Sequence, residues 1–187
     1  NRACNFAYLR TNKKIVNKHN RAKQKVTILS LHLKVGGIEK AICSLANMLV
    51  DDYDVEIVNV YELCKPSFYI DERVKVTYLS NDLKPNKEEL KSAFKNKSIK
   101  KIITEGFKAL KVVLKKRNLI KQAAKDNDGD IIVSTTLAFN KAFSKYQKNK
   151  LLIAWEHCHP DRSPNYAKKV YKAVKKFDLF IPPSKSI

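Results

Sequence analysis

Short apolar runs alternate along the chain with segments whose apolar residues recur at helical spacing. The apolar runs, which we interpret as strands, cover residues 25–33, 55–63, 74–80, 130–134, 151–157 and 178–184. The helical segments cover residues 38–49, a long stretch after Pro85 with a break near residues 96–98, then residues 137–146 and 163–177. Strands that alternate with helices indicate parallel β-α units, so we expect an α/β fold with a Rossmann-like, doubly wound and mostly parallel sheet.

The carboxyl ends of the strands are where such a sheet binds its ligands. The residues that follow the strands are therefore the candidates for substrate binding. They are Gly36, Gly37 and Glu39 after the first strand, Thr135 and Thr136 after the fourth, His157 and His159 after the fifth, and Ser184 after the sixth.

The adjacent glycines Gly36 and Gly37 stand between the first strand and the first helix. Glycine lets the backbone come close to a ligand, and a helix N-terminus offers unpaired N–H groups and a positive dipole end. These properties together suit a phosphate group. The chain has neither the Gly-x-Gly-x-x-Gly dinucleotide fingerprint nor a Walker sequence, so a tight turn that binds no ligand is an equal interpretation of the pair alone.

The densest polar cluster is "EHCHPD", at residues 156–161. Such near neighbours cannot usually all turn toward one ion, and no second cluster supplies the missing ligands, so we expect no metal site. A histidine at a strand end that hydrogen-bonds a substrate hydroxyl or a developing charge is the preferred interpretation of His157. A structural or surface histidine is the alternative.

Several other polar residues have structural interpretations. His32 lies inside the first expected strand, as a packed or half-exposed residue, and Cys43 falls on the apolar face of the first helix, where a buried thiol is expected. Thr135 and Thr136 offer hydroxyls to a ligand or cap the next helix. The four cysteines are scattered, which favours a reduced, intracellular chain over a disulfide framework.

The net charge of +20 is concentrated in two segments. Residues 1–25 carry +8 and residues 84–125 carry +11. Such a field attracts anionic polymers or an anionic membrane surface, whereas interspersed lysines on solvated faces are the simpler explanation. We expect residues 1–24 to form a basic N-terminal arm outside the core, and residues 25–187 to form the folded domain.

The order of four sequence stretches resembles the N-terminal domain of family 4 glycosyltransferases, which have the two-domain GT-B architecture. These stretches are "GGIEKAICSLANML" after the first strand, "DIIVSTT", "IAWEHCHP" and the final "FDLFIPPSKSI". The resemblance covers residues 25–187, and no single motif in it is diagnostic. The chain begins without Met and stops within the pattern, so we expect a fragment that lacks the C-terminal donor domain.

The resemblance implies a retaining transferase that moves a sugar from a nucleotide-sugar to a polysaccharide, glycolipid or lipid-linked acceptor, without a metal or other cofactor. The N-terminal domain would bind mainly the acceptor, and Gly36 and Gly37 would approach the donor's diphosphate across the cleft. His157 would lie near the transferred sugar, with His159 as second choice. Ser184 would sit where the first domain passes to the second, and the fragment alone would have little activity.

The basic stretch from Lys97 to Lys125 gives this enzyme a second expected partner. Many similar enzymes work at the cytoplasmic face of a membrane, so its lysines would rest on anionic headgroups while its apolar stripe packs on the sheet. We therefore expect a cytoplasmic protein, peripheral to the membrane. The alternatives are a nucleic-acid-binding module, which the scarcity of Arg and of an aromatic platform disfavours, and another GT-B enzyme such as a sugar epimerase.

Overall fold

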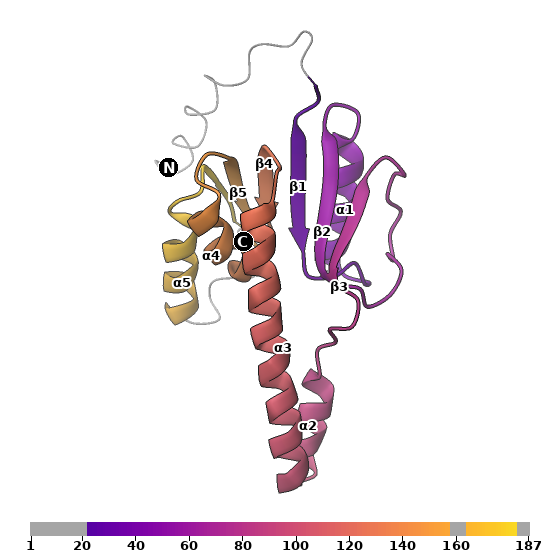
Figure 1. Cartoon of the computed structure of the whole chain (residues 1–187), viewed down its shortest axis with the longest axis vertical. Helices are drawn as coiled ribbons and strands as arrows, with labels where there is room; N and C mark the ends of the chain where they lie inside the picture. The colour runs from indigo at the N-terminus through magenta and orange to yellow at the C-terminus, as the bar shows by residue number, and fades with distance from the viewer. Residues whose placement is uncertain (1–21, 158–163, 183–187) are drawn as a thin grey trace, which may run out of the picture.

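The computed structural model describes residues 22–157 and 164–182. The described residues form one sheet, whose strands are β1 (Lys25–Ser30), β2 (Asp54–Tyr61), β3 (Lys75–Ser80), β4 (Ile131–Ser134), β5 (Leu151–Trp155) and β6 (Leu179–Ile181). The strands lie in the order β3-β2-β1-β4-β5-β6, and every neighbouring pair is parallel (Figure 1). The expected α/β class with a doubly wound parallel sheet is confirmed.

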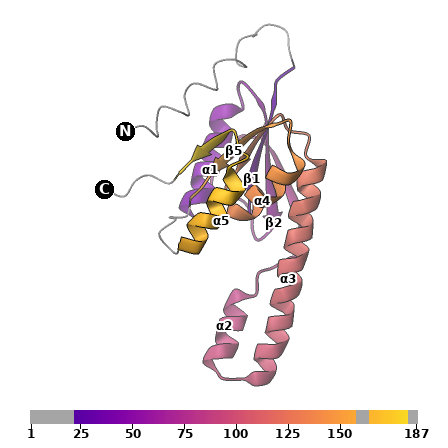
Figure 2. The ribbon, with the colours of Figure 1, turned by 90° about the vertical axis from the view of Figure 1, so that its left-hand side faces the viewer.

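Helices cover both faces of this sheet (Figure 2). They are α1 (Gly37–Leu49), α2 (Lys87–Lys95), α3 (Ile99–Asp126), α4 (Leu137–Tyr146) and α5 (Pro164–Val174). One core lies between the sheet and α1, where Ile42, Cys43 and Ala46 pack against alternate residues of β1 and β2. The other core joins the opposite face to α4 and the last turns of α3, through Phe139, Phe143, Ile120 and Ala124 among others. Burial of Cys43 confirms its expected place in the core.

The central strands β1 and β4 are neighbours in the sheet although about a hundred residues separate them in the chain. From β1 the chain moves through α1 to β2, and from β3 it returns through α2 and α3 to the other side of β1. The strand order therefore reverses between β1 and β4, which is where an open α/β sheet forms its ligand crevice. The Thr135 hydroxyl donates a hydrogen bond of 2.7 Å to the Leu29 carbonyl oxygen and ties the two strand ends together.

The α2–α3 hairpin, residues 87–126, extends well beyond the sheet (Figures 1 and 2). The break between its helices, expected near residues 96–98, is confirmed. There Lys97 has a positive φ of 51°, and the N–H groups of Lys97 and Ser98 donate to the carbonyl oxygens of Phe94 and Ala93. These two bonds are the Schellman arrangement that closes a helix C-terminus.

The expected packing of the long helix was wrong for the part of its apolar stripe that extends past the sheet (Figure 1). We expected the apolar stripe of this segment to lie on the sheet, but Ile99, Ile103 and Phe107 are 73%, 59% and 66% exposed. In α3, Ile120 and Ala124 are buried against the sheet. Helical periodicity places residues on one face but does not say what covers that face, and here the helix is longer than the sheet it packs on.

Four strands end earlier than the sequence predicted. β1 ends at Ser30 instead of residue 33, and β2 ends at Tyr61 instead of residue 63. β5 ends at Trp155 instead of residue 157, and β6 ends at Ile181 instead of residue 184. The Ser30 hydroxyl donates a 2.8 Å hydrogen bond to the carbonyl oxygen of His32, so the chain turns there instead of continuing the strand. No helix in residues 22–157 and 164–182 is long and apolar enough to cross a bilayer.

Candidate functional site

The candidate site lies at the carboxyl ends of β1, β4 and β5, on the face of the sheet that α1 covers. Alternate residues of a strand point to the same face. On β1 and β5 that rule places Ser30 and Trp155 toward α1, because Ile28 and Ile153 belong to the α1-side core. His157 follows Trp155 by two positions. The N-terminus of α1, with Gly36 and Gly37, closes the same corner.

The first turn of α1 leaves backbone N–H groups available. Helix α1 begins at Gly37, no side chain caps it, and its first internal hydrogen bond runs from the Lys40 N–H to the Gly36 carbonyl oxygen at 3.0 Å. The N–H groups of residues 37–39 therefore have no partner within the helix. This end of the helix attracts negative charge through its dipole.

The two glycines have different surroundings. Gly36 is extended (φ 175°, ψ 160°), a conformation that any residue adopts, but the Glu39 carboxyl group lies where a Cβ at Gly36 would stand. Nothing lies within 4 Å of the position of a Cβ at Gly37. The internal packing of the protein thus gives a reason for glycine at position 36 and none at position 37.

Glu39 connects the helix N-terminus to two histidines. Its side chain is 13% exposed, and its Oε1 lies 3.3 Å from Nδ1 of His32, whose side chain is 31% exposed. The contact is an ion pair only when the His32 imidazole is protonated, and the two atoms lack the geometry of a hydrogen bond. The charge of Glu39 also acts on His157 and on the Cys43 thiol, whose pKa is raised first by burial and then by this carboxylate.

His157 is a partly buried imidazole held against Trp155. The ring centroids are 4.4 Å apart and the planes are inclined by 51°. Burial lowers the pKa of His157 below its ordinary value of 6.5, and the negative charge of Glu39 opposes this effect without reversing it. Its Nε2 atom is buried and has no hydrogen-bond partner among the described residues. A neutral imidazole of this kind can accept or donate one hydrogen bond to a substrate hydroxyl.

The two threonines after β4 differ in what their hydroxyls do. Thr135 is buried, and its hydroxyl proton is used in the bond to Leu29, so this residue holds the strand ends in place. Thr136 stands at the N-cap position of α4 but makes no capping hydrogen bond, and its Oγ1 has no partner among the described residues. The hydroxyl of Thr136 is therefore buried and unpaired, whereas that of Thr135 is used within the fold.

Sequence reasoning did not assign His32 and Trp155 to the site. We expected His32 inside the first strand, but β1 ends before it, which frees its ring to turn toward Glu39. Trp155 was recognised only as part of a strand, although its spacing of two residues from His157 indicates a shared face. His159 and Ser184 lie outside the described residues.

A metal-binding cluster is absent from the part of the chain that the structure describes. No three side chains of His, Cys, Asp and Glu come together there in a way that could hold an ion. The cluster of residues 156–161, considered in the sequence, lies mostly outside this part, since only Glu156 and His157 are described. Glu156 accepts a hydrogen bond of 3.2 Å from the Tyr166 hydroxyl, which links it to α5.

Comparison with known proteins does not assign the chain to a family. No family model matches it, and no curated protein sequence matches it.

Proposed function

We propose that this chain is the acceptor-binding, N-terminal domain of a retaining glycosyltransferase. The enzyme would move a sugar from a nucleotide-sugar to a glycan, glycolipid or lipid-linked acceptor. The observation that carries the proposal is the meeting of three features at one corner of the sheet. These are the uncapped N-terminus of α1 behind Gly36 and Gly37, the Glu39 carboxylate, and the partly buried imidazole of His157.

The helix N-terminus would meet the donor's diphosphate. A phosphate oxygen can accept hydrogen bonds from the free N–H groups of residues 37–39, and the open space at Gly37 lets it approach the backbone. The Glu39 carboxylate lies beside Gly36, next to these N–H groups. It would have to swing away when the phosphate arrives, because two anions cannot share the same N–H groups without a cost in free energy.

His157 would act on the sugar that is transferred. Its lowered pKa keeps the ring neutral at pH 7, so Nε2 can pair with a sugar hydroxyl without bringing a charge. Trp155 holds one face of the ring and limits its rotation. A second Rossmann-like domain, implied by the resemblance, would hold the nucleotide and complete the donor site.

Backbone NMR of the 187-residue chain, titrated with nucleoside-diphosphate sugars, tests this assignment. We expect weak binding, with amide shifts at residues 37–39 and a shift of the His157 ring resonances. Gly37→Val should abolish these changes. Gly106→Val is the matched control, because a Cβ at Gly106 also meets nothing within 4 Å and this residue lies on α3. No shifts at residues 37–39 at millimolar ligand, or equal losses in both variants, would contradict the proposal.

A further inference from the structure

Six large apolar side chains of α3 are exposed to solvent on one side of the helix. We call them the apolar stripe: Ile99, Ile103, Phe107, Leu110, Val113 and Leu114, which are 46–73% exposed. At 3.6 residues per turn they fall within a sector of about 120°. Phe94 of α2 is 60% exposed as well. A contiguous apolar surface of this extent that is exposed to solvent usually marks a binding site.

The hairpin that carries the stripe is rich in basic residues. Residues 87–117 contain eleven Lys and Arg against three Glu, a net charge of +8. Glu88 pairs with Lys91 and Glu105 pairs with Lys108, so the few acids are partly neutralised within the hairpin. Lys100 and Lys111 make no ion pair in the described part of the chain, which leaves their charges available to a partner.

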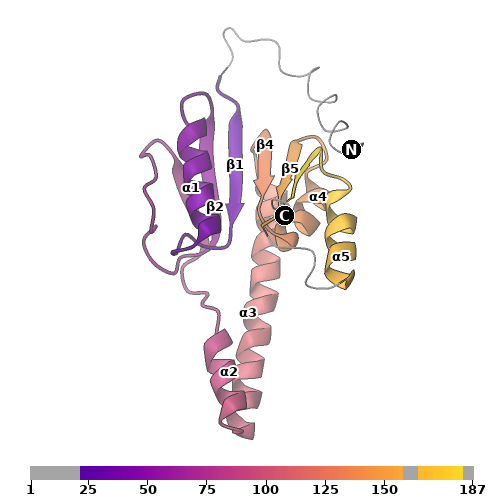
Figure 3. The ribbon, with the colours of Figure 1, turned by 180° about the vertical axis from the view of Figure 1, so that it is seen from behind.

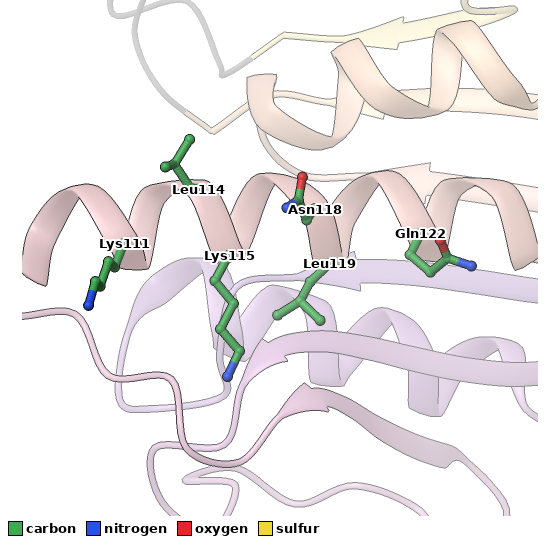
Figure 4. A pocket seen from close by; sticks show the side chains of 6 residues that line it. All are labelled: Lys111, Leu114, Lys115, Asn118, Leu119 and Gln122. Atoms are coloured by element: carbon green, nitrogen blue, oxygen red, sulfur yellow. The ribbon is translucent and has the colours of Figure 1, made fainter.

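A shallow groove of about 480 Å³ continues the stripe toward the sheet. Figure 4 shows its lining, formed by Lys111, Leu114, Lys115, Asn118, Leu119 and Gln122. The side chains of Lys111 and Lys115 extend from the same side of α3 in this view, and Lys115 also pairs with Asp82 at 2.8 Å. The groove therefore offers ammonium groups directly beside apolar side chains.

We propose that the α2–α3 hairpin docks on an anionic lipid bilayer, with the apolar stripe inserted at the boundary of headgroups and acyl chains and the lysines on lipid phosphates. Interfacial helices combine these two features, an apolar face and a strongly basic polar face. The charge of the hairpin is complementary to an anionic leaflet. The inference rests on the hairpin alone and does not depend on the transferase proposal.

Two other occupants fit the surface less well. A second copy of the chain would bring two faces of charge +8 together, and like charges at close range repel. A nucleic acid would match the lysines but leave Ile103, Phe107 and Leu110 in contact with water or phosphate. A bilayer interface satisfies both the charges and the apolar side chains.

Docking in this way would orient the rest of the molecule. The hairpin extends from the end of the sheet at which β1 and β4 terminate (Figure 3). The candidate site at those strand ends would then be on the side of the molecule nearer the lipid. A water-insoluble acceptor held in the bilayer could reach it from there.

Flotation of the 187-residue chain with vesicles tests the proposal. Phosphatidylcholine vesicles with phosphatidylglycerol should bind the chain at least tenfold more tightly than vesicles of phosphatidylcholine alone, and high salt should weaken the electrostatic part. Ile103→Ser with Phe107→Ser should weaken binding at least tenfold. Met48→Ser with Tyr171→Ser is the matched control, because these side chains are 77% and 71% exposed on other helices, and it should change binding less than twofold.

A second pair of variants tests the basic residues. Lys100→Glu with Lys111→Glu should weaken binding at least tenfold, since each charge near an anionic leaflet contributes about fivefold. Lys148→Glu with Lys172→Glu changes the net charge equally on exposed residues outside the hairpin, and should have a smaller effect. All these side chains are exposed, so the thermal midpoint should remain close to that of the parent chain.

Three results would overturn the proposal. The first is equal binding to neutral and anionic vesicles. The second is a loss of vesicle binding in the control variants that is as large as the loss in the hairpin variants. The third is tight binding to RNA or DNA at physiological salt that the serine variants leave unchanged while vesicles are not bound, which would assign the lysines to a nucleic acid instead.

Discussion

Oε1 of Glu39 lies 3.3 Å from Nδ1 of His32, and the same carboxyl group lies over the Cα of Gly36. The carboxylate therefore occupies the positive end of α1, where an anionic ligand would also bind. It also contributes to the electrostatic environment of His157. A single side chain thus links the helix N-terminus to both histidines of the candidate site.

Replacing either glycine of the pair should separate internal packing from ligand binding. Gly37→Ala should raise the free energy of unfolding by about 0.5 kcal/mol, because alanine loses less backbone entropy on folding and its Cβ meets no atom. Gly36→Ala should lack this gain, since its Cβ must displace the Glu39 carboxyl group. Chemical denaturation of the three proteins measures both effects. A destabilised Gly37→Ala variant would contradict the open space at that position.

The protonation of His157 should make stability depend on pH. Its pKa is lower in the folded chain than the ordinary 6.5, so the unfolded chain takes up its proton first as the pH falls. Stability is therefore fully present above about pH 6.5 and decreases below it, until the folded-state pKa is passed. The free energy of unfolding should fall less between pH 7.5 and pH 5.5 in His157→Gln than in the parent chain, as chemical denaturation at the two pH values would measure.

Removal of the Glu39 charge should lower the pKa of His157 further. The carboxylate opposes the effect of burial, so Glu39→Gln leaves burial without this opposition. An NMR titration of the His157 ring in both proteins measures the difference. Glu72→Gln is the control, because this exposed carboxyl group lies in the loop between β2 and β3. An unchanged or higher pKa in Glu39→Gln would mean that the two groups do not interact.

The turn of the hairpin should become more stable with glycine at position 97. Lys97 adopts a positive φ of 51° in the Schellman closure of α2, and this conformation costs a residue with a Cβ about 1 kcal/mol relative to glycine. Lys97→Gly should raise the free energy of unfolding by up to that amount. Lys91→Gly, within α2, removes the same side chain but should lower stability by about 1 kcal/mol. Equal effects of the two variants would contradict the turn geometry.

The alternation of apolar runs and helical segments was enough to predict the fold class and the order of the elements. Apolar and β-branched residues fill four of the six positions of β1 and five of the eight positions of β2, and this signal is local in sequence. The strand ends were harder to place, because the chain leaves β1 through a side-chain bond of Ser30 to the backbone, which no apolar pattern reveals.

The candidate site was predicted only in outline. The rule that ligands bind at strand ends led to Gly36, Glu39 and His157, whose place at one corner depends on the strand order. His32 and Trp155 were missed, since their role comes from contacts across the corner with Glu39 and His157. The exposure of the α3 stripe also could not be read from periodicity, because it depends on how far the helix extends past the sheet.

A sugar-transfer assay of the enzyme proposed above tests its function most directly. Labelled nucleotide-sugars would be supplied with glycan and lipid-linked acceptors, and the anomeric configuration of the product determined. We expect transfer with retention, a kcat lowered about 10²-fold or more by His157→Ala, and weakened donor use in Gly37→Val. Tyr171→Ala, on α5, should leave the rate unchanged. Absence of transfer from every nucleotide-sugar, or full activity in both site variants, would contradict the proposed function.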